Sequence, residues 1–151
     1  MGSTLTAEDT AAYFLALVEE DEGELMSHLK LQKLCYYAQG FHLALTGHPL
    51  FDDRIEAWTH GPVVPTLWRR YQRYEDGPIP KVEVDFAKYP AATREILDEV
   101  YQVYGQFSAW KLRNMTGEES PWLAARASGA DAEITHASLR DYFSDFVLAE
   151  A

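Results

Sequence analysis

Hydrophobic residues recur with helical spacing through the stretch from Ser27 to Thr46. The apolar positions are separated by three, four, three and four residues and are Leu31, Leu34, Ala38, Phe41 and Leu45. The opposite side is not plainly polar and carries Gln32, Tyr36, Gln39 and Leu43. At about 100° per residue, this pattern predicts an α-helix over about 28–46 that is apolar on most of its circumference. With Ser27 as N-cap and Gly47 just after its end, we expect a central helix around which other elements pack.

The same spacing predicts shorter helices on both sides of the central one. They run from about Thr6 to Glu20, Thr66 to Tyr74, Ala91 to Tyr104, Ser108 to Met115, Ser120 to Ser128, and onward from Thr135. Ser120 followed by Pro121 is typical of an N-cap and a first helical residue. Between the helices, Leu50 and Phe51 are too apolar for an exposed loop, and we expect both to enter the core.

Extended structure is expected only in short stretches. The apolar positions from Ile79 to Phe86 suggest a strand, which at most pairs in a hairpin with residues 54–58. His60, Gly61 and Pro62 are typical of a turn. Without internal repeats or long linkers, the sequence predicts a mostly α-helical fold. We expect a compact single-domain bundle over residues 1–151, around the central helix, with at most a small β-hairpin.

Composition narrows the classes of function. The 151 residues are 47% hydrophobic and 13% aromatic, which is enough for a sizeable core, and carry a formal net charge of −11. Such a charge disfavours binding to nucleic acid phosphates and to anionic membranes. No apolar run approaches the roughly 20 residues of a membrane span. A single cysteine, Cys35, and an acidic N-terminal stretch that makes a poor signal peptide predict a cytoplasmic protein.

Residues for catalysis or metal binding do not fall into recognisable patterns. The five histidines form no metal-binding spacing, and Cys35 lies two helical turns from His42, too far for a nucleophile–base pair. The acidic pairs Asp52-Asp53 and Glu118-Glu119 are interpreted as solvated loop carboxylates. We therefore predict no enzyme activity, no metal and no cofactor. The alternative is a small enzyme with a pocket formed by His60, Asp52 and Asp53.

Aromatic residues interleaved with arginines indicate a protein-binding surface. These residue types are enriched at interface hot spots. The predicted partner-binding residues are Trp58, His60, Trp68, Arg69, Tyr71 and Arg73. Two other interpretations stay open, namely that the aromatics pack the core and that the arginines pair with the many carboxylates of the chain. A third alternative is a DNA-binding autorepressor, which needs Arg69, Arg70 and Arg73 on one exposed face.

Three blocks of sequence resemble a known family. They are LKLQKLCYYAQGFHLALTGHPLF from Leu29, IEAWTHGPVVPTLWRRY from Ile55, and ESPW from Glu119 with a DYF-containing helix near the C-terminus. Together they are similar to the Panacea domain, the SocA-like antitoxin family, which includes phage-associated proteins. The residues that carry the family signature are Lys30, Gln32, Lys33, Tyr36, Tyr37, Gly61, Pro62 and Trp122.

This resemblance implies a mostly α-helical antitoxin of a toxin–antitoxin pair. Its partner would be a cognate protein toxin, which most family members neutralise by direct contact. In the SocA branch the antitoxin is instead a proteolytic adaptor that delivers the toxin to the ClpXP protease. One departure concerns the segment before the SPW motif. Relatives often have a Thr-His pair there, whereas this chain has Thr116-Gly117, so any role of that histidine is not shared.

The polar residues of the central helix suggest a supporting role. Packing alone does not require Lys30, Gln32, Lys33, Tyr36 and Tyr37 on a helix so apolar. Our hypothesis is that their polar ends fix the EAWTHGPV segment that follows the helix.

Overall fold

The computed structural model of the protein describes residues 5–20, 23–75 and 77–150. The α-helices in these ranges are α1 (Ala7–Leu17), α2 (His28–Thr46), α3 (Pro65–Tyr71), α4 (Ala91–Tyr104), α5 (Ala109–Thr116), α6 (Ser120–Ser128) and α7 (His136–Glu150). Short 3₁₀ helices are η2 (Gln72–Tyr74) and η3 (Phe86–Lys88), and the strands are β1 (Ile55–Trp58), β2 (Gly61–Val63) and β3 (Glu133–Ile134). The prediction of a mostly α-helical fold is confirmed.

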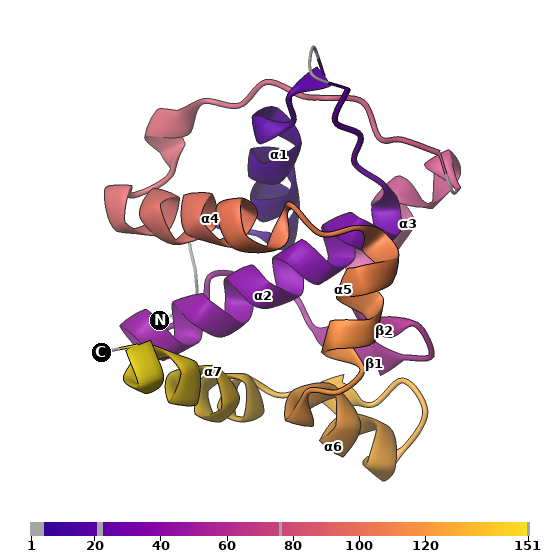
Figure 1. The fold of residues 1–151 in the computed structure, drawn as a ribbon, viewed down its shortest axis with the longest axis vertical. Helices are drawn as coiled ribbons and strands as arrows, with labels where there is room; N and C mark the ends of the chain where they lie inside the picture. Colours follow the sequence, from indigo (N-terminus) through magenta and orange to yellow (C-terminus); the bar gives the residue numbers. More distant parts are fainter. Residues whose placement is uncertain (1–4, 21–22, 76, 151) are drawn as a thin grey trace.

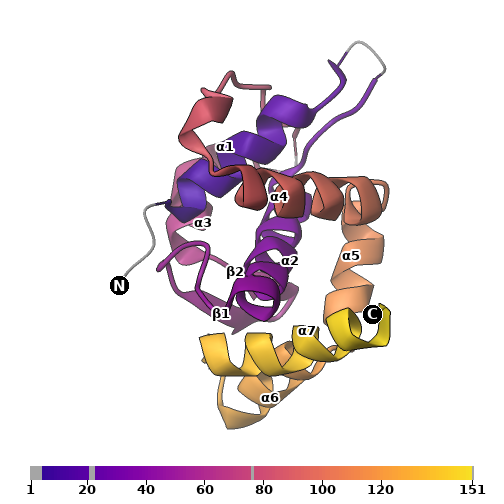
Figure 2. The same ribbon diagram turned by 90° about the vertical axis from the view of Figure 1, so that its left-hand side faces the viewer.

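Helix α2 runs through the middle of the molecule and is contacted from all sides. In Figure 1, α1 and α4 lie on one side of it and α6 and α7 on the other, with α5 crossing near the hairpin. Figure 2 shows the same layering, with α4 and α7 on opposite sides of α2. Every residue of α2 from 31 to 40 is buried, so the expectation of a central helix is confirmed. Leu45, by contrast, is 50% exposed.

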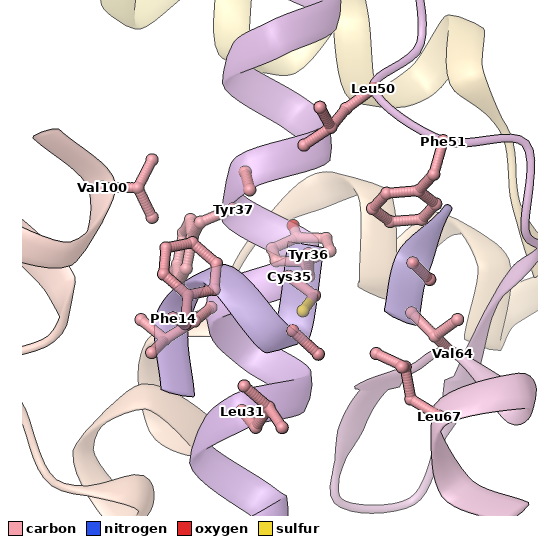
Figure 3. Packing of buried hydrophobic residues seen from close by; sticks show 14 of the residues in the cluster. Phe14, Leu31, Cys35, Tyr36, Tyr37, Leu50, Phe51, Val64, Leu67 and Val100 are labelled. Carbon is pink, nitrogen blue, oxygen red and sulfur yellow. The ribbon is translucent and has the colours of Figure 1, made fainter. Parts of the chain in front are cut away.

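Side chains from distant parts of the chain meet around α2. Figure 3 shows Phe14 of α1 and Val100 of α4 on one side of the helix, and Phe51, Val64 and Leu67 on the other. Phe51 and its neighbour Leu50 are buried, as predicted. The amide of Gln39 on α2 binds both ends of this turn: its Oε1 accepts from the Leu50 N–H and its Nε2 donates to the Phe51 carbonyl oxygen, each at 2.7 Å.

The helix boundaries follow capping residues. Ser27, Ser108 and Thr135 each accept a hydrogen bond from the backbone N–H three residues later, as the sequence predicts. Ser120 is not a cap, because the N-cap position of α6 belongs to Glu119. The first helix is shorter than predicted and ends at Leu17, while the predicted Thr66–Tyr74 helix tightens into η2 for its last turn.

The strand predicted over Ile79–Phe86 is wrong. Strand β1 has antiparallel partners on both edges, β2 and β3, so the sheet offers this segment no place beside it. The segment is instead held at its start, where the Ile79 N–H donates to the Met26 carbonyl oxygen. The predicted turn at residues 60–62 is also displaced. Gly61 and Pro62 belong to edge strand β2, where proline is tolerated because its nitrogen has no ladder bond to make.

Candidate partner-binding site

The candidate site is built on the β1–β2 hairpin. Trp58 pairs with Gly61, which leaves Thr59 and His60 as the exposed turn. Gly61 has a φ of 115° and a Cβ at this position would lie 2.8 Å from Cε of Lys33. Glycine is therefore required by the backbone conformation and by the close approach of α2 beneath the hairpin.

A glutamine of α2 holds the residue that follows the hairpin. Oε1 of Gln32 accepts a hydrogen bond of 2.8 Å from the Val64 N–H, and its Nε2 lies 3.4 Å from the Val64 carbonyl oxygen. The same Nε2 lies 2.9 Å from Nε2 of His28. The His28 ring stacks on the indole of Trp68, with 5.1 Å between centroids. Gln32 thus fixes the start of α3 and, through His28, the position of an exposed tryptophan.

Lys33 is a fully buried lysine beneath the hairpin. Its Nζ donates a hydrogen bond of 3.4 Å to the carbonyl oxygen of Pro62. Burial disfavours the ammonium form, and repulsion by the Arg113 guanidinium adds to this, so the pKa of Lys33 is lowered to about 7. The cation below the hairpin therefore gains or loses its proton near neutral pH.

Two tyrosines of α2 bind one buried carboxylate. The hydroxyls of Tyr36 and Tyr37 donate to the two oxygens of Glu119 at 2.9 and 2.8 Å. Burial raises the pKa of Glu119 to about 7, although both tyrosine hydrogen bonds favour the ionised form and oppose the rise. Because Glu119 occupies the N-cap position of α6, these bonds join α2 to the start of that helix.

The hypothesis that polar residues of α2 fix the EAWTHGPV segment is confirmed for Lys33, which bonds Pro62. Gln32 bonds Val64, the residue just after that segment, and the hypothesis is wrong for the other three. Tyr36 and Tyr37 hold α6 through Glu119, and Lys30 donates to the carbonyl oxygen of Gly105, just after α4. The polar residues of α2 therefore position three separate segments, namely the hairpin, the residue after α4 and the start of α6.

All four tryptophans of the chain gather around the hairpin. The rings of Trp58 and Trp68 meet edge to face at 5.5 Å between centroids. The Trp122 Nε1 donates to the Trp58 carbonyl oxygen at 2.9 Å, and Trp122 and Trp110 line one cleft of about 440 Å³. We call these four residues the tryptophan group. Trp110 is 63% exposed and Trp68 41%, so the group offers aromatic surface to solvent.

Arginines flank the tryptophan group. Arg69 and Arg70 on α3 and Arg73 on η2 are exposed and form no ion pair with a carboxylate in the described part of the chain. On the other side of the hairpin, the guanidinium of Arg113 lies 4.8 Å from the Trp110 ring centroid and that of Arg126 lies 5.7 Å from the Trp122 centroid. This surface is cationic and aromatic, although the chain as a whole is acidic.

Comparison with known proteins decides the family. Residues 31–123, more than half of the chain, match the family described as antitoxin SocA-like, Panacea domain. The chain belongs to this family. It is also similar to antitoxin SocA of Caulobacter vibrioides (strain NA1000 / CB15N), with 48% identity over 44 residues. That stretch covers 29% of this chain and 23% of SocA, so the chain matches less than a quarter of its relative's length. No solved structure matches the chain.

The residues predicted to bind a partner occupy different depths in this Panacea domain. His60, Trp68, Arg69 and Arg73 are exposed, and Trp58 is half-buried beside Trp68. Tyr71 is only 8% exposed, with its ring 6.0 Å from that of His28, which leaves little of it for a partner. The signature residues Gly61, Pro62 and Trp122 lie at the hairpin and on α6, where α2 supports them.

The alternative enzyme site is not assembled in this Panacea domain. Oδ1 of Asp53 accepts from the Ala7 N–H at the start of α1, and its Oδ2 accepts from the Thr66 hydroxyl. His60 instead faces the cleft that Trp110 and Trp122 line, and neither Asp52 nor Asp53 lines that cleft. Within residues 5–20, 23–75 and 77–150, no group of three or more His, Cys, Asp or Glu side chains could hold a metal ion. No helix in these ranges is long and apolar enough to cross a membrane.

Sequence reasoning misplaced one functional residue and passed over another. Glu119 was interpreted as a solvated loop carboxylate, which is wrong, because it is 8% exposed and bound by two tyrosines. Arg113 was not singled out, although it shares a helix face with Trp110, three residues before it. The presence of Glu119 within the ESPW block was the one signal that separated it from Glu118, which is exposed.

Proposed function

We propose that this Panacea domain is an antitoxin that neutralises a cognate protein toxin by direct protein–protein contact in the cytoplasm. Membership of the antitoxin SocA-like family supports the antitoxin role. The observation that carries the proposal is the cationic surface formed by the tryptophan group and its flanking arginines. Trp and Arg are the residue types that contribute most to binding energy at protein interfaces.

The hairpin surface is held rigid before any partner arrives. Gln32 and Lys33 fix the backbone at Val64 and Pro62, and Tyr36 and Tyr37 fix the start of α6. A surface that is already ordered loses less conformational entropy on association. The buried polar residues of α2 thereby favour tight binding without touching the partner themselves.

The test is co-expression of this chain with the product of the adjacent reading frame. We expect the neighbour alone to arrest growth, the pair to restore it, and the two proteins to co-purify. The double variant Trp68→Ala, Arg69→Gln should weaken both rescue and co-purification by at least about tenfold. Leu25→Ala and Arg140→Gln, at exposed positions outside this surface, serve as matched controls and should behave as wild type. Growth arrest that the wild-type chain does not relieve would overturn the proposal.

Two forms of the proposal differ in their need for a protease. A simple neutraliser should rescue growth equally well in cells that lack ClpXP. A proteolytic adaptor should lose rescue in those cells, and the toxin should accumulate there. Pulse-chase measurement of toxin half-life, with and without this chain, separates the two forms directly.

A further inference from the structure

A polar cleft of about 440 Å³ lies between the hairpin turn and helices α5 and α6. The hairpin contributes His60 and Gly61, α5 contributes Trp110, Arg113 and Asn114, and Trp122 lines it from α6. Trp110, Arg113 and Asn114 are spaced at i, i+3 and i+4, so α5 turns one whole face toward the cleft.

The arrangement of Arg113 leaves its donors available. Its guanidinium lies over the Trp110 ring at 4.8 Å. A guanidinium carries five N–H groups along its edge, in a fork that matches a carboxylate, and Arg113 forms no ion pair with a carboxylate among the residues that the structure describes. The Trp110 indole thus provides apolar surface directly beside the charge of Arg113.

A lysine whose pKa is lowered to about 7 lies beneath the floor of the cleft. Gly61 lines the cleft, and the Nζ of the fully buried Lys33 would lie 3.2 Å from a Cβ at that glycine. The Arg113 guanidinium acts on Lys33 as a repelling charge. Burial and the charge of Lys33 together lower the pKa of His28, and Tyr36 and Tyr37 lie one helical turn further along α2.

The carboxylate at the cleft is that of Glu118, which is exposed at the edge. The buried carboxylate beside this region, Glu119, is bound by Tyr36 and Tyr37. Arg113 has no carboxylate as an ion-pair partner in the described ranges of the chain, so its charge can stabilise an incoming anion.

We propose that this cleft binds an acidic peptide segment of a protein partner. A carboxylate of that segment binds the edge of Arg113, and a neighbouring apolar side chain packs between Trp110 and Trp122. That the partner is a protein rests on the proposed function. A nucleic acid fits less well, because the net charge of −11 and the carboxylate of Glu118 oppose a dense row of phosphates. An isolated carboxylate feels that repulsion far less.

The test uses two synthetic peptides and the indole N–H signals of the four tryptophans in NMR spectra. One peptide is acetyl-Leu-Glu-Asp-Phe-amide, and the other is acetyl-Leu-Gln-Asn-Phe-amide, which has the same shape without charge. We expect the acidic peptide to shift the Trp110 and Trp122 signals most, and to bind at least about tenfold more tightly than the amide peptide. Arg113→Gln should abolish this preference, whereas Arg140→Gln, an exposed arginine on α7, should preserve it.

Three results would overturn the inference. They are unchanged Trp110 and Trp122 signals at millimolar acidic peptide, equal binding of the two peptides, and tighter binding of a short DNA duplex to the same residues. The peptide titration does not depend on the toxin, so it decides about the cleft even if the neighbouring gene product is not neutralised. Conversely, full growth rescue by Arg113→Gln would show that the cleft does not contribute to toxin binding, and the proposed function would still hold.

Discussion

Helix α2 meets the hairpin and helix α7 in two very different ways. Toward the hairpin it presents an amide and an ammonium group, which bind the backbone of Val64 and Pro62. Toward α7 it presents a glycine, Gly40, against the buried ring of Phe143. The first contact is polar and specific in direction. The second is mainly apolar packing, with one polar pair of 3.5 Å between Gln39 and His136 at the start of α7.

The difference separates stabilising the fold from positioning the site. Apolar contacts are non-directional, so they stabilise a helix pair without fixing a loop to a fraction of an ångström. Hydrogen bonds to backbone groups have strict geometry but contribute only about 1 kcal/mol each in net stability. The contact with α7 should therefore dominate stability, and the contact with the hairpin should dominate binding. Substitutions of Phe143, Gln32 and Lys33 test this division, in decreasing order of the expected effect on stability. A pH series on Glu119 tests the separate contact between α2 and the start of α6.

The largest effect should come from Phe143→Ala. Removing this fully buried ring from the α2–α7 contact should lower the free energy of unfolding by about 3–5 kcal/mol. A Cβ at Gly40 would lie 2.2 Å from Cδ2 of Phe143. Gly40→Ala should therefore destabilise the wild type, by about 1–3 kcal/mol, but stabilise the Phe143→Ala variant, where the added methyl has room. Urea denaturation of the four proteins measures this cycle, and additive effects would contradict the shape argument.

A smaller loss is expected for Gln32→Ala. This change leaves the buried Val64 N–H without its acceptor, which should cost about 2 kcal/mol. The Val64 carbonyl oxygen keeps the N–H groups of Leu67 and Trp68. The Trp68 indole should also become more mobile, because His28 loses its amide neighbour. Thermal unfolding followed by circular dichroism gives the stability. Toxin affinity should fall by more than the decrease in the folded fraction of the variant accounts for. An unchanged affinity for the toxin would show that Gln32 does not position the binding surface.

The third prediction concerns pH. The pKa of Glu119 is about 7 in the folded protein against 4.5 for the ordinary group. The folded state therefore holds this proton more tightly, so its stabilising contribution is complete below pH 4.5 and is lost as pH rises through 7. His28 and Lys33, with lowered pKa values, act in the opposite direction.

Comparing variants isolates the contribution of Glu119. Relative to Glu119→Gln, the wild type should lose stability between pH 4.5 and pH 7, as measured by urea denaturation. Glu118→Gln, at the exposed neighbouring position, should follow the wild-type curve at every pH. Parallel curves for wild type and Glu119→Gln would show that the two tyrosines hold the carboxylate ionised throughout.

The smallest effect on stability is expected for Lys33→Met. Methionine fills a similar volume and removes the cost of burying an ammonium group, so the free energy of unfolding should stay within about 1 kcal/mol of wild type. Binding of the toxin should nevertheless weaken several-fold, because Pro62 loses its tether to α2. Lys88→Met, at an exposed lysine of η3, is the control. A stable variant with unchanged binding would remove the positioning role of Lys33.

The helices could be predicted because each is encoded by local spacing and capping. Ala91–Tyr104 was predicted with the bounds that the structure has, from apolar positions three and four residues apart. The sheet could not be predicted, because β3 is only two residues long and pairs with β1 across 79 residues from Ile55 to Ile134. The false strand at Ile79–Phe86 shows the same limit, since apolar residues there pack against helices without any strand partner.

The site divides along the same line. Exposed arginines next to aromatics on α3 are visible in one short stretch of sequence. The bonds from Tyr36 and Tyr37 to Glu119 join residues 83 and 82 positions apart, and nothing local in the sequence tells a buried carboxylate from a solvated one. The cleft needs the hairpin, α5 and α6 together, so it exists only once the chain is folded.

The position of the tryptophans has a consequence for how this protein can be observed. Because all four lie around the hairpin, intrinsic fluorescence excited at the red edge of the spectrum is emitted by one end of the molecule. Far-ultraviolet circular dichroism, by contrast, is dominated by helices spread over the whole of it. The two signals are independent optical reports on the hairpin end and on the helical body, obtained from the same unlabelled sample.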